Sequence, residues 1–381
     1  MSRIVIACDS FKGSLTSGEA AEAIAEGIRA ACPDCGITAI PVADGGEGTL
    51  DAVQKAVNGK WMTTQTFDPL MRRTEAPWLM IERDGTKTAV IELASASGLT
   101  LLGQDELNPM MTTTYGTGVI VREAISHGCK DIVLTLGGSA TNDAGAGLLA
   151  AIGINFWHDD EIVSIPCGKD LEGITRITYT NIYRGTKQAH FTLACDVDTP
   201  FCGKQGAAWI FARQKGATDE MIDVLDKGLE HFAAIAKEYT GKDIAQIPGS
   251  GAAGGTAGGL LAFTDARIIS GAEMVLDLAG FDEAINGASL VITGEGRIDA
   301  QTMKGKLPSI VAARAAAHGI PVIAVCGKCG KDIDAEMLPF KVLETCPKDM
   351  DTAFAMQKRQ AKTNIITAVA TYISSTLPDN D

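Results

Sequence analysis

The stretch SLVITGEGRIDAQTMKGKLPSIVAARAAAHGIPVIAVCG, residues 289–327, determines the fold class that the sequence predicts. It opens with a short, β-branched apolar run at residues 290–292, which is typical of a buried parallel strand. A polar loop follows, and Pro308 then suits the first turn of a helix that ends at Gly319. A second apolar run at residues 321–325 predicts the next buried strand, so the stretch forms one βαβ unit.

The polar residues of this unit gather just beyond the carboxyl end of its first strand. Glu295, Arg297 and Lys306 all lie between that strand and the helix. Because ligands of open parallel sheets bind at the carboxyl ends of the strands, we expect a functional site here.

The first fifty residues repeat the same order of strand, polar loop and helix. A strand at residues 4–8 leads into DSFKGS (residues 9–14) and then into a helix for which Ser17 is the expected N-cap. A strand at residues 37–42 leads into ADGGEGT (residues 43–49). Parallel strands would bring both loops to the same edge of one sheet.

The middle of the chain has a different pattern. Apolar and polar residues alternate between residues 63 and 93, which predicts antiparallel strands and hence a second domain. A length of 381 residues also exceeds one ordinary core. We therefore predict an α/β fold in which a discontinuous Rossmann-like parallel-sheet domain, residues 1–62 and 270–381, carries a second α/β domain, residues 63–269, inserted into it. The active site is expected in the cleft between the two domains.

Two further acidic positions follow apolar strands within the inserted part. A strand at residues 131–136 precedes GGSATND (residues 137–143), and a later apolar strand ends at Asp196. A carboxylate at such a place has little structural reason to be there, so the pattern favours a functional role for Asp143, Asp196 and Glu295.

Composition excludes several classes of partner. The chain carries 33 basic and 47 acidic residues, a net charge of −14, which argues against binding to nucleic acid or to an anionic membrane surface. No uninterrupted apolar stretch has membrane-spanning length, and Met1 runs almost directly into the first strand. These features predict a cytoplasmic globular protein.

The ten cysteines are expected to be free thiols, many of them inside apolar strands. Two Cys-x-x-Cys pairs, Cys32 with Cys35 and Cys326 with Cys329, leave a four-thiolate zinc site as the alternative.

The strand-end loops combine three kinds of group that phosphoryl transfer to an alcohol requires. Glycine-rich turns bind phosphate through backbone N–H groups, carboxylates bind Mg²⁺ or accept a hydroxyl proton, and lysines neutralise the transferred charge. Simpler roles remain open for four of the residues, because Asp9 and Asp44 could cap the helices that follow and Lys12 and Lys306 could be solvated surface lysines.

The recognised nucleotide fingerprints are missing or weak. Every Gly-Lys pair lacks a following Ser or Thr, so the chain has no Walker A loop. GSGAAG (residues 249–254) matches the dinucleotide pattern, but a poor strand precedes it, which disfavours a dinucleotide site. Scattered histidines and the lack of a Gly-x-Ser-x-Gly elbow disfavour zinc and serine hydrolases.

Taken together and in order, these loops resemble the bacterial type I glycerate kinase family. The resemblance extends over nearly the whole chain. The segments that carry it are DSFKGS (9–14), ADGGEGT (43–49), TTTYGTG (112–118), LGGSATND (136–143), ACDV (194–197), QKGA (214–217), PGSGAAGG (248–255) and TGEGRIDAQT (293–302) with Gly305-Lys306.

The chain departs from the pattern of this family at a few positions. Met71 and Ala144 stand where the family usually has glycine. Asp198-Thr199 stands where Thr-Asn is typical, and Ala212-Arg213 replaces Gly-Pro.

The resemblance implies an ATP- and Mg²⁺-dependent kinase that acts on D-glycerate and forms 2-phosphoglycerate, with two α/β domains. Loop position then suggests individual roles. The expected catalytic residues are Asp196 as the base, Asp143 as the second choice for it, and Lys12. The expected substrate-binding residues are Ser10, Lys12, Asp44, Ser139 and Arg297, and the expected nucleotide- and phosphate-binding residues are Gly137, Gly138, Ser139, Gly251, Gly254, Gly255 and Lys306. The expected Mg²⁺ ligands are Glu295 and Asp44.

Three alternatives remain at the level of sequence. One is a kinase for another small hydroxy acid or polyol, and one is a non-catalytic sensor of carbohydrate acids. The third is an NAD-dependent dehydrogenase that would use residues 249–254. The expected partners are small molecules, and a homodimer is compatible with the sequence.

Overall fold

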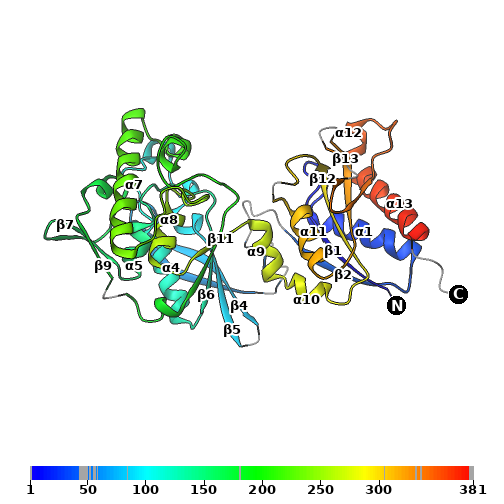
Figure 1. Ribbon diagram of the computed structural model, residues 1–381, viewed down its shortest axis with the longest axis horizontal. Coiled ribbons are helices and arrows are strands. Elements are labelled where there is room, and N and C mark those ends of the chain that lie inside the picture. Colours follow the sequence, from blue (N-terminus) through cyan, green and yellow to red (C-terminus); the bar gives the residue numbers. More distant parts are fainter. Residues whose placement is uncertain are drawn as a thin grey trace. The chain divides into compact units, whose positions relative to one another are not determined.

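The computed structural model of the 381-residue chain describes residues 2–42, 50, 53–54, 57, 59–83, 85–179, 182–303, 305–330, 333–334 and 337–376. The chain divides into two units, which Figure 1 shows. Unit 1 comprises Met1–Val57 and Gly271–Asp381, and unit 2 comprises Asn58–Ser270. Unit 1 is thus discontinuous in sequence. The sequence places these boundaries at residues 62/63 and 269/270.

Unit 1 is built on a five-stranded parallel sheet in the order β14-β13-β12-β1-β2. The central strands are apolar along most of their length, and residues 4–7 of β1 are fully buried. Burial of both faces of these strands explains their continuous apolar sequence. The strands are β1 (Arg3–Cys8), β2 (Gly36–Pro41), β12 (Leu290–Ile298), β13 (Val322–Cys329) and β14 (Lys341–Glu344).

The helices of unit 1 include α1 (Ser17–Ala31), which packs against α13 (Lys358–Thr376). Gly27 allows this close approach, because a Cβ there would lie 2.8 Å from the carbonyl oxygen of Ile366. Thr16, one residue before the predicted Ser17, is the N-cap, and it forms a capping box with Glu19. The other helices are α9 (Gly271–Leu278), α10 (Phe281–Ile285), α11 (Leu307–Ala317) and α12 (Thr352–Ala355).

Strand β12 extends further than the sequence predicts. The expected loop after residue 292 continues as strand to Ile298, where it pairs with Cys329 of β13. Gly294 permits this pairing, because a Cβ there would lie 2.3 Å from the carbonyl oxygen of Val325. Glu295 therefore projects from a strand and not from a loop.

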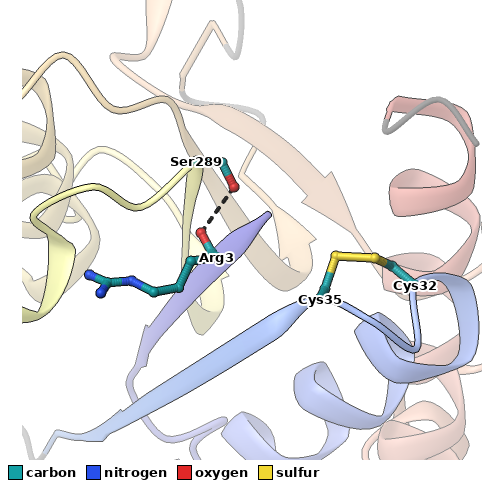
Figure 2. The surroundings of a disulfide bond; sticks show 4 residues. All are labelled: Arg3, Cys32, Cys35 and Ser289. Atoms are coloured by element: carbon teal, nitrogen blue, oxygen red, sulfur yellow. Dashed lines mark hydrogen bonds between the residues drawn. A yellow bond between two sulfur atoms is a disulfide. The ribbon is translucent and has the colours of Figure 1, made fainter. Parts of the chain in front are cut away.

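The expectation that all cysteines are free is wrong for one pair, because Cys32 and Cys35 form a disulfide (Figure 2). The turn between α1 and β2 brings their Cα atoms to 5.5 Å, a separation that suits a disulfide. Cys326 and Cys329 are free thiols.

The alternative of a zinc site shared by the two Cys-x-x-Cys pairs is also wrong. Cys35 directly precedes Gly36, which pairs with Arg3 at the amino end of β1. Figure 2 shows this amino-terminal edge, where Ser289 Oγ also donates a hydrogen bond of 3.0 Å to the Arg3 carbonyl. Cys326 instead pairs with Glu295 near the carboxyl ends of the strands, so the pairs lie at opposite edges of the sheet.

Unit 2 contains a six-stranded mixed sheet in the order β11-β10-β6-β5-β4-β3. The first four strands of this order are mutually parallel, whereas β3, β4 and β5 form an antiparallel meander, as the alternating sequence predicts. The α/β fold class is therefore confirmed. The strands are β3 (Lys60–Phe67), β4 (Arg73–Arg83), β5 (Thr86–Glu92), β6 (Asp131–Thr135), β10 (His190–Ala194) and β11 (Arg267–Ile269).

The sheet of unit 2 packs with helices around one apolar core that includes Phe156, Phe201 and Phe232. Of the helices that the structure describes, none is long and apolar enough to cross a membrane. The α-helices of unit 2 are α3 (Ala94–Ser97), α4 (Tyr115–Ser126), α5 (Ala146–Ala151), α6 (Ala207–Phe211), α7 (Asp219–Thr240) and α8 (Thr256–Phe263). Short 3-10 helices lie at Leu99–Leu101, Gln104–Glu106, Gly168–Gly173, Thr186–Gln188 and Arg213–Lys215, and a small antiparallel sheet consists of β7 (Asn155–His158), β8 (Glu161–Val163) and β9 (Arg176–Thr178).

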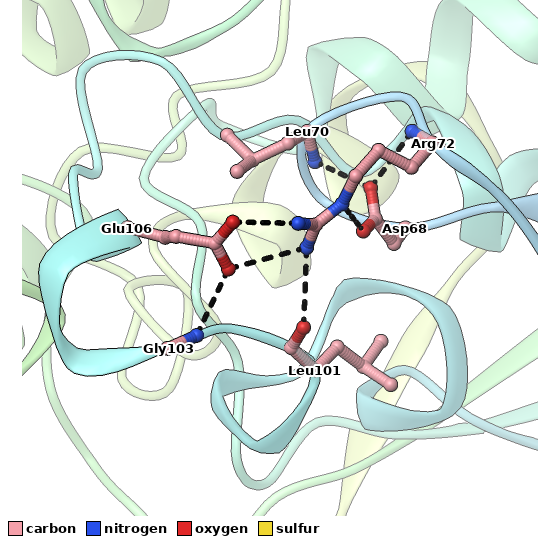
Figure 3. Close-up of polar contacts among 6 residues, drawn as sticks. All are labelled: Asp68, Leu70, Arg72, Leu101, Gly103 and Glu106. Atoms are coloured by element: carbon pink, nitrogen blue, oxygen red, sulfur yellow. Dashed lines mark hydrogen bonds and ion pairs between the residues drawn. The ribbon is translucent and has the colours of Figure 1, made fainter.

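A polar cluster fixes the turn between β3 and β4 (Figure 3). The Asp68 carboxylate accepts hydrogen bonds of 2.9 Å from the amides of Leu70 and Arg72. The Arg72 guanidinium donates to Asp68 and, at 2.6 Å, to Glu106. The turn places Met71 at φ +64°, a left-handed conformation that glycine adopts more easily.

Candidate active site

A cavity of about 150 Å³ lies at the carboxyl ends of the parallel strands of unit 2. Thr135 at the end of β6 pairs with Ala194 at the end of β10, so the loops after these two strands lie side by side. Both loops line the cavity. The cavity lies at the carboxyl edge of this sheet, which is the kind of position where the sequence predicts a site.

The loop after β6 contributes Gly137, Gly138 and Ser139 to the cavity wall, and all three were expected at a phosphate site. Gly137 and Gly138 are exposed, and a Cβ on Gly137 would have no atom of the described chain within 4 Å. Ser139 is buried. This loop leaves room for a ligand to approach its backbone.

Asp196 lines the same cavity from the loop after β10 and is exposed to solvent. Its neighbour Cys195 also lines the cavity, and burial raises the pKa of the Cys195 thiol. The structure thus places the predicted base next to the predicted glycine loop.

Lys215 is a cavity residue to which the sequence pattern assigns no role. Its side chain is only 2% exposed, and its Nζ donates hydrogen bonds of 2.8 Å to Ser139 Oγ and 2.7 Å to the Thr141 carbonyl. Burial lowers the pKa of Lys215 to about 7, although the charge of Asp143 acts in the opposite direction. The one sequence feature that marks Lys215 is its place in QKGA, residues 214–217. The burial of Lys215 could not be predicted from this segment, because a lysine in a polar segment normally lies in solvent.

Asp143 does not line the cavity. It is fully buried, and its carboxylate accepts hydrogen bonds from the amide and hydroxyl of Thr114 and from the amides of Gly145 and Gly147. Burial raises the pKa of Asp143, and these hydrogen bonds oppose the increase. The geometry does not support its expected catalytic role, because its oxygens hold the residues before α4 against the start of α5.

Gly251, Gly254 and Gly255 likewise do not line the cavity, whereas Ala252 and Ala253 between them do. A Cβ on Gly254 would lie 2.0 Å from the Thr141 carbonyl oxygen, and one on Gly251 would lie 2.2 Å from that of Pro200. The Gly251 amide already donates to the Thr199 carbonyl. Close packing therefore accounts for the presence of glycine at these positions and does not require a bound phosphate. No strand of the described chain directly precedes residues 249–254, so the dinucleotide reading also lacks its structural context.

Unit 1 brings together a second group of predicted residues at the carboxyl ends of β1 and β12. The Asp9 amide donates a hydrogen bond of 2.9 Å to the Gly294 carbonyl. Gly296 lies against the backbone of Phe11 and Lys12, since a Cβ there would be 3.3 Å from the Lys12 nitrogen. Ser10 and Lys12 therefore lie on a loop that packs beside the end of β12, and the Lys12 side chain is exposed.

Glu295 is the most buried acidic residue of this group, with 7% of its surface exposed. Its Oε1 accepts a hydrogen bond of 2.5 Å from Thr302 Oγ1, and its Oε2 lies 3.7 Å from Lys306 Nζ. Burial raises the pKa of Glu295, with Thr302 and Lys306 acting against this and the charges of Asp9 and Asp299 adding to it.

Arg297 lies on the exposed end of β12, with its Nε 3.7 Å from Asp299 Oδ2. Arg297, Lys306 and Lys12 place three positive charges at this edge of unit 1, where the acidic residues Asp9, Glu295 and Asp299 also lie.

Among the described residues, no group of three histidine, cysteine, aspartate or glutamate side chains could hold a metal ion. Glu295 is a single carboxylate donor at the strand edge, and Asp44 lies outside the described residues. Mg²⁺ usually keeps several waters and takes further oxygens from substrate phosphates, so one or two protein carboxylates suffice. The described residues therefore fit a Mg²⁺ that is bound largely through phosphate and water.

Comparisons with known proteins agree on one family. The sequence profile of the glycerate kinase family matches residues 4–376. A glycerate kinase from Halalkalibacterium halodurans is 44% identical over 335 residues, which cover 88% of each chain. A glycerate 2-kinase from Escherichia coli K12 is 40% identical over 331 residues, 87% of this chain and 86% of that protein. A crystal structure from Salmonella typhimurium LT2, provisionally named glycerate kinase 2, has a TM-score of 0.80 and 35% identity and covers 98% of both chains.

Proposed function

The chain belongs to the glycerate kinase family and is a kinase, and from this premise we propose that it transfers the γ-phosphoryl group of ATP to the 2-hydroxyl of D-glycerate. The observation that carries the proposal is the cavity of unit 2, where the exposed Asp196 lies beside the open Gly137–Gly138 backbone. A carboxylate and free backbone amides are the groups that orient an alcohol and hold a phosphate. The 2-hydroxyl is proposed because the relative from Escherichia coli is a glycerate 2-kinase.

In the proposed reaction, the Asp196 carboxylate orients the glycerate 2-hydroxyl and accepts its proton. The hydroxyl oxygen forms the new bond to the γ-phosphorus while the bond from that phosphorus to the bridging oxygen of ADP breaks. The backbone of residues 137–139 holds phosphate oxygens, and Ser139 contacts the substrate. Positioning and charge stabilisation account for most of the rate increase in such reactions.

The residues of unit 1 supply positive charge and the proposed metal site. Ser10, Lys12 and Arg297 bind the carboxylate of glycerate or the transferring group, and Lys306 binds phosphate. Bound Mg²⁺ would neutralise phosphate charge, and Glu295 is the described residue whose carboxylate would help to hold it. That both groups of residues act on one pair of substrates stays a prediction.

The test is ADP release measured with D-glycerate, L-glycerate, other small hydroxy acids and polyols, each with and without Mg²⁺. Phosphorus NMR of the product then distinguishes 2-phosphoglycerate from 3-phosphoglycerate. We expect Mg²⁺-dependent ADP release with D-glycerate and a 2-phosphate product. Preference for another acceptor would show that D-glycerate is not the main substrate. Glycerate binding without ADP release would refute the proposed transfer from ATP to glycerate.

A further inference from the structure

Lys215 is a buried lysine whose amine has no carboxylate partner within ion-pair distance in the part of the chain that the structure describes. Two of its three N–H donors are used, by Ser139 and by the Thr141 carbonyl. A lysine is rarely buried without a paired charge, because an unpaired ammonium is poorly solvated inside a protein.

The cavity itself explains this arrangement. Lys215 lines it together with Asp196 and the backbone of Gly137 and Gly138, so a ligand there would meet the ammonium. The hydrogen bond to Ser139 also ties the lysine to the end of the glycine loop. An anion in the cavity would supply the missing counter-charge and could use the third N–H donor.

We propose that Lys215 binds an anionic oxygen group of a substrate in the unit 2 cavity and, through Ser139, holds the glycine loop in place around it. The identity of that substrate rests on the proposed glycerate kinase function. The volume of about 150 Å³ is below the range of roughly 300–1,000 Å³ that accommodates drug-sized ligands. The cavity therefore has room for a small acid or for one phosphoryl group of a larger ligand.

The carboxylate of glycerate and the terminal phosphoryl group of ATP both carry anionic oxygens, so both fit this proposal. Binding of either should be coupled to proton uptake. The titratable groups around Lys215 are Asp143 from the loop after β6, whose charge acts on the lysine, and Cys195 and Asp196, which line the same cavity from the loop after β10. Since burial lowers the pKa of the free amine to about 7, an anion that binds the ammonium has to compete with deprotonation above that pH.

The experiment measures the dissociation constants of D-glycerate, ATP and inorganic phosphate, each alone, between pH 6 and pH 9 by calorimetry. The variants are Lys215→Met, which keeps the length of the side chain without its charge, and Lys215→Arg, which keeps the charge at every pH. Lys242→Met is the matched control. Lys242 also donates to two carbonyls, those of Leu261 and Thr264, but it is exposed and does not line the cavity. Thermal unfolding of each variant checks that it is folded.

In the wild type and in Lys242→Met, we expect the affinity for at least one of the anions to fall roughly tenfold per pH unit above pH 7. Lys215→Met should bind that anion at least tenfold more weakly with no such pH dependence, and Lys215→Arg should restore binding without the pH dependence. The affected anion, D-glycerate or ATP, identifies the group that Lys215 binds.

Unchanged binding of all three anions by a folded Lys215→Met would overturn the proposal, as would the same pH dependence in Lys215→Arg. Failure of the proposed function looks different. The wild type would then release no ADP with D-glycerate, while phosphate binding would still report on Lys215.

Discussion

The hydroxyl of Thr114 donates a hydrogen bond of 2.7 Å to the carboxylate of the fully buried Asp143, and the Thr114 amide donates another, of 2.8 Å, to the same oxygen. Asp143 therefore joins the segment before α4 to the start of α5. We therefore expect a substitution of Asp143 to lower the stability of the fold more than it directly affects the chemical step.

Asp143→Ala should lower the free energy of unfolding by roughly 3–5 kcal/mol, because it leaves the buried donors of Thr114 and α5 without an acceptor. Urea unfolding measures this directly. The exposed Asp160→Ala is the control and should change the free energy by less than about 0.5 kcal/mol. A stable Asp143→Ala protein that has lost only turnover would restore Asp143 as a candidate catalytic residue.

An alanine at Gly254 should lower the stability of the protein, whereas an alanine at Gly137 should lower its activity. Gly254→Ala places a Cβ 2.0 Å from the Thr141 carbonyl oxygen at φ +64°, so we expect a loss of roughly 2–5 kcal/mol of stability. Gly137→Ala meets no described atom within 4 Å and should keep its stability, yet lower kcat/KM roughly 10–100-fold by disturbing the position of the ligand. Chemical denaturation and steady-state kinetics of both variants are the measurements. Equal stability of the two would contradict the assignment of Gly254 to packing.

Met71 lies at φ +64° in the turn that Asp68 and Arg72 stabilise, a left-handed conformation that glycine adopts more easily. Met71→Gly should stabilise the protein by roughly 0.5–1 kcal/mol, since the relief of left-handed strain exceeds the added entropy of the unfolded chain. Met71→Ala keeps the Cβ and should show no gain. A lower melting temperature for Met71→Gly than for Met71→Ala would show that the turn is not strained.

The pH dependence of turnover should report on Glu295 and Thr302. If the Glu295 carboxylate is the active form, kcat/KM falls as the pH decreases through its pKa, which burial raises above the ordinary glutamate value. Thr302→Val removes the hydrogen bond that lowers this pKa, so the acid limb of the profile should move to higher pH. Thr345→Val, which removes a buried hydroxyl bonded to the Cys326 carbonyl in the same unit, should leave the limb in place. A limb that persists unchanged in Glu295→Gln would assign it to another group.

Much of the fold follows from local sequence. The apolar β-branched runs predict β1, β2, β6 and β10 to within about one residue at either end, and alternation predicts the antiparallel meander. The extension of β12 to Ile298 could not be predicted, because its sequence is polar and glycine-rich and only the adjacent β13 provides its hydrogen-bond partners.

The candidate site was predictable where a residue follows a strand and remains exposed, as Gly137 and Asp196 do. It was not predictable where tertiary packing determines the role. Gly254 and Asp143 have the same sequence signal as Gly137 and Asp196, but the structure places them in contacts between backbone segments and away from the cavity lining. Lys215 shows the converse, because only the fold reveals that this lysine is buried.

The most direct test of the account is single-turnover phosphorylation of D-glycerate by Asp196→Asn beside the wild type, with thermal unfolding measured for both. We predict a rate constant lower by a factor of roughly 10²–10⁴ in a variant that unfolds at the wild-type temperature. Phosphoryl transfer by folded Asp196→Asn at the wild-type rate would contradict the proposed role of Asp196 in the unit 2 cavity.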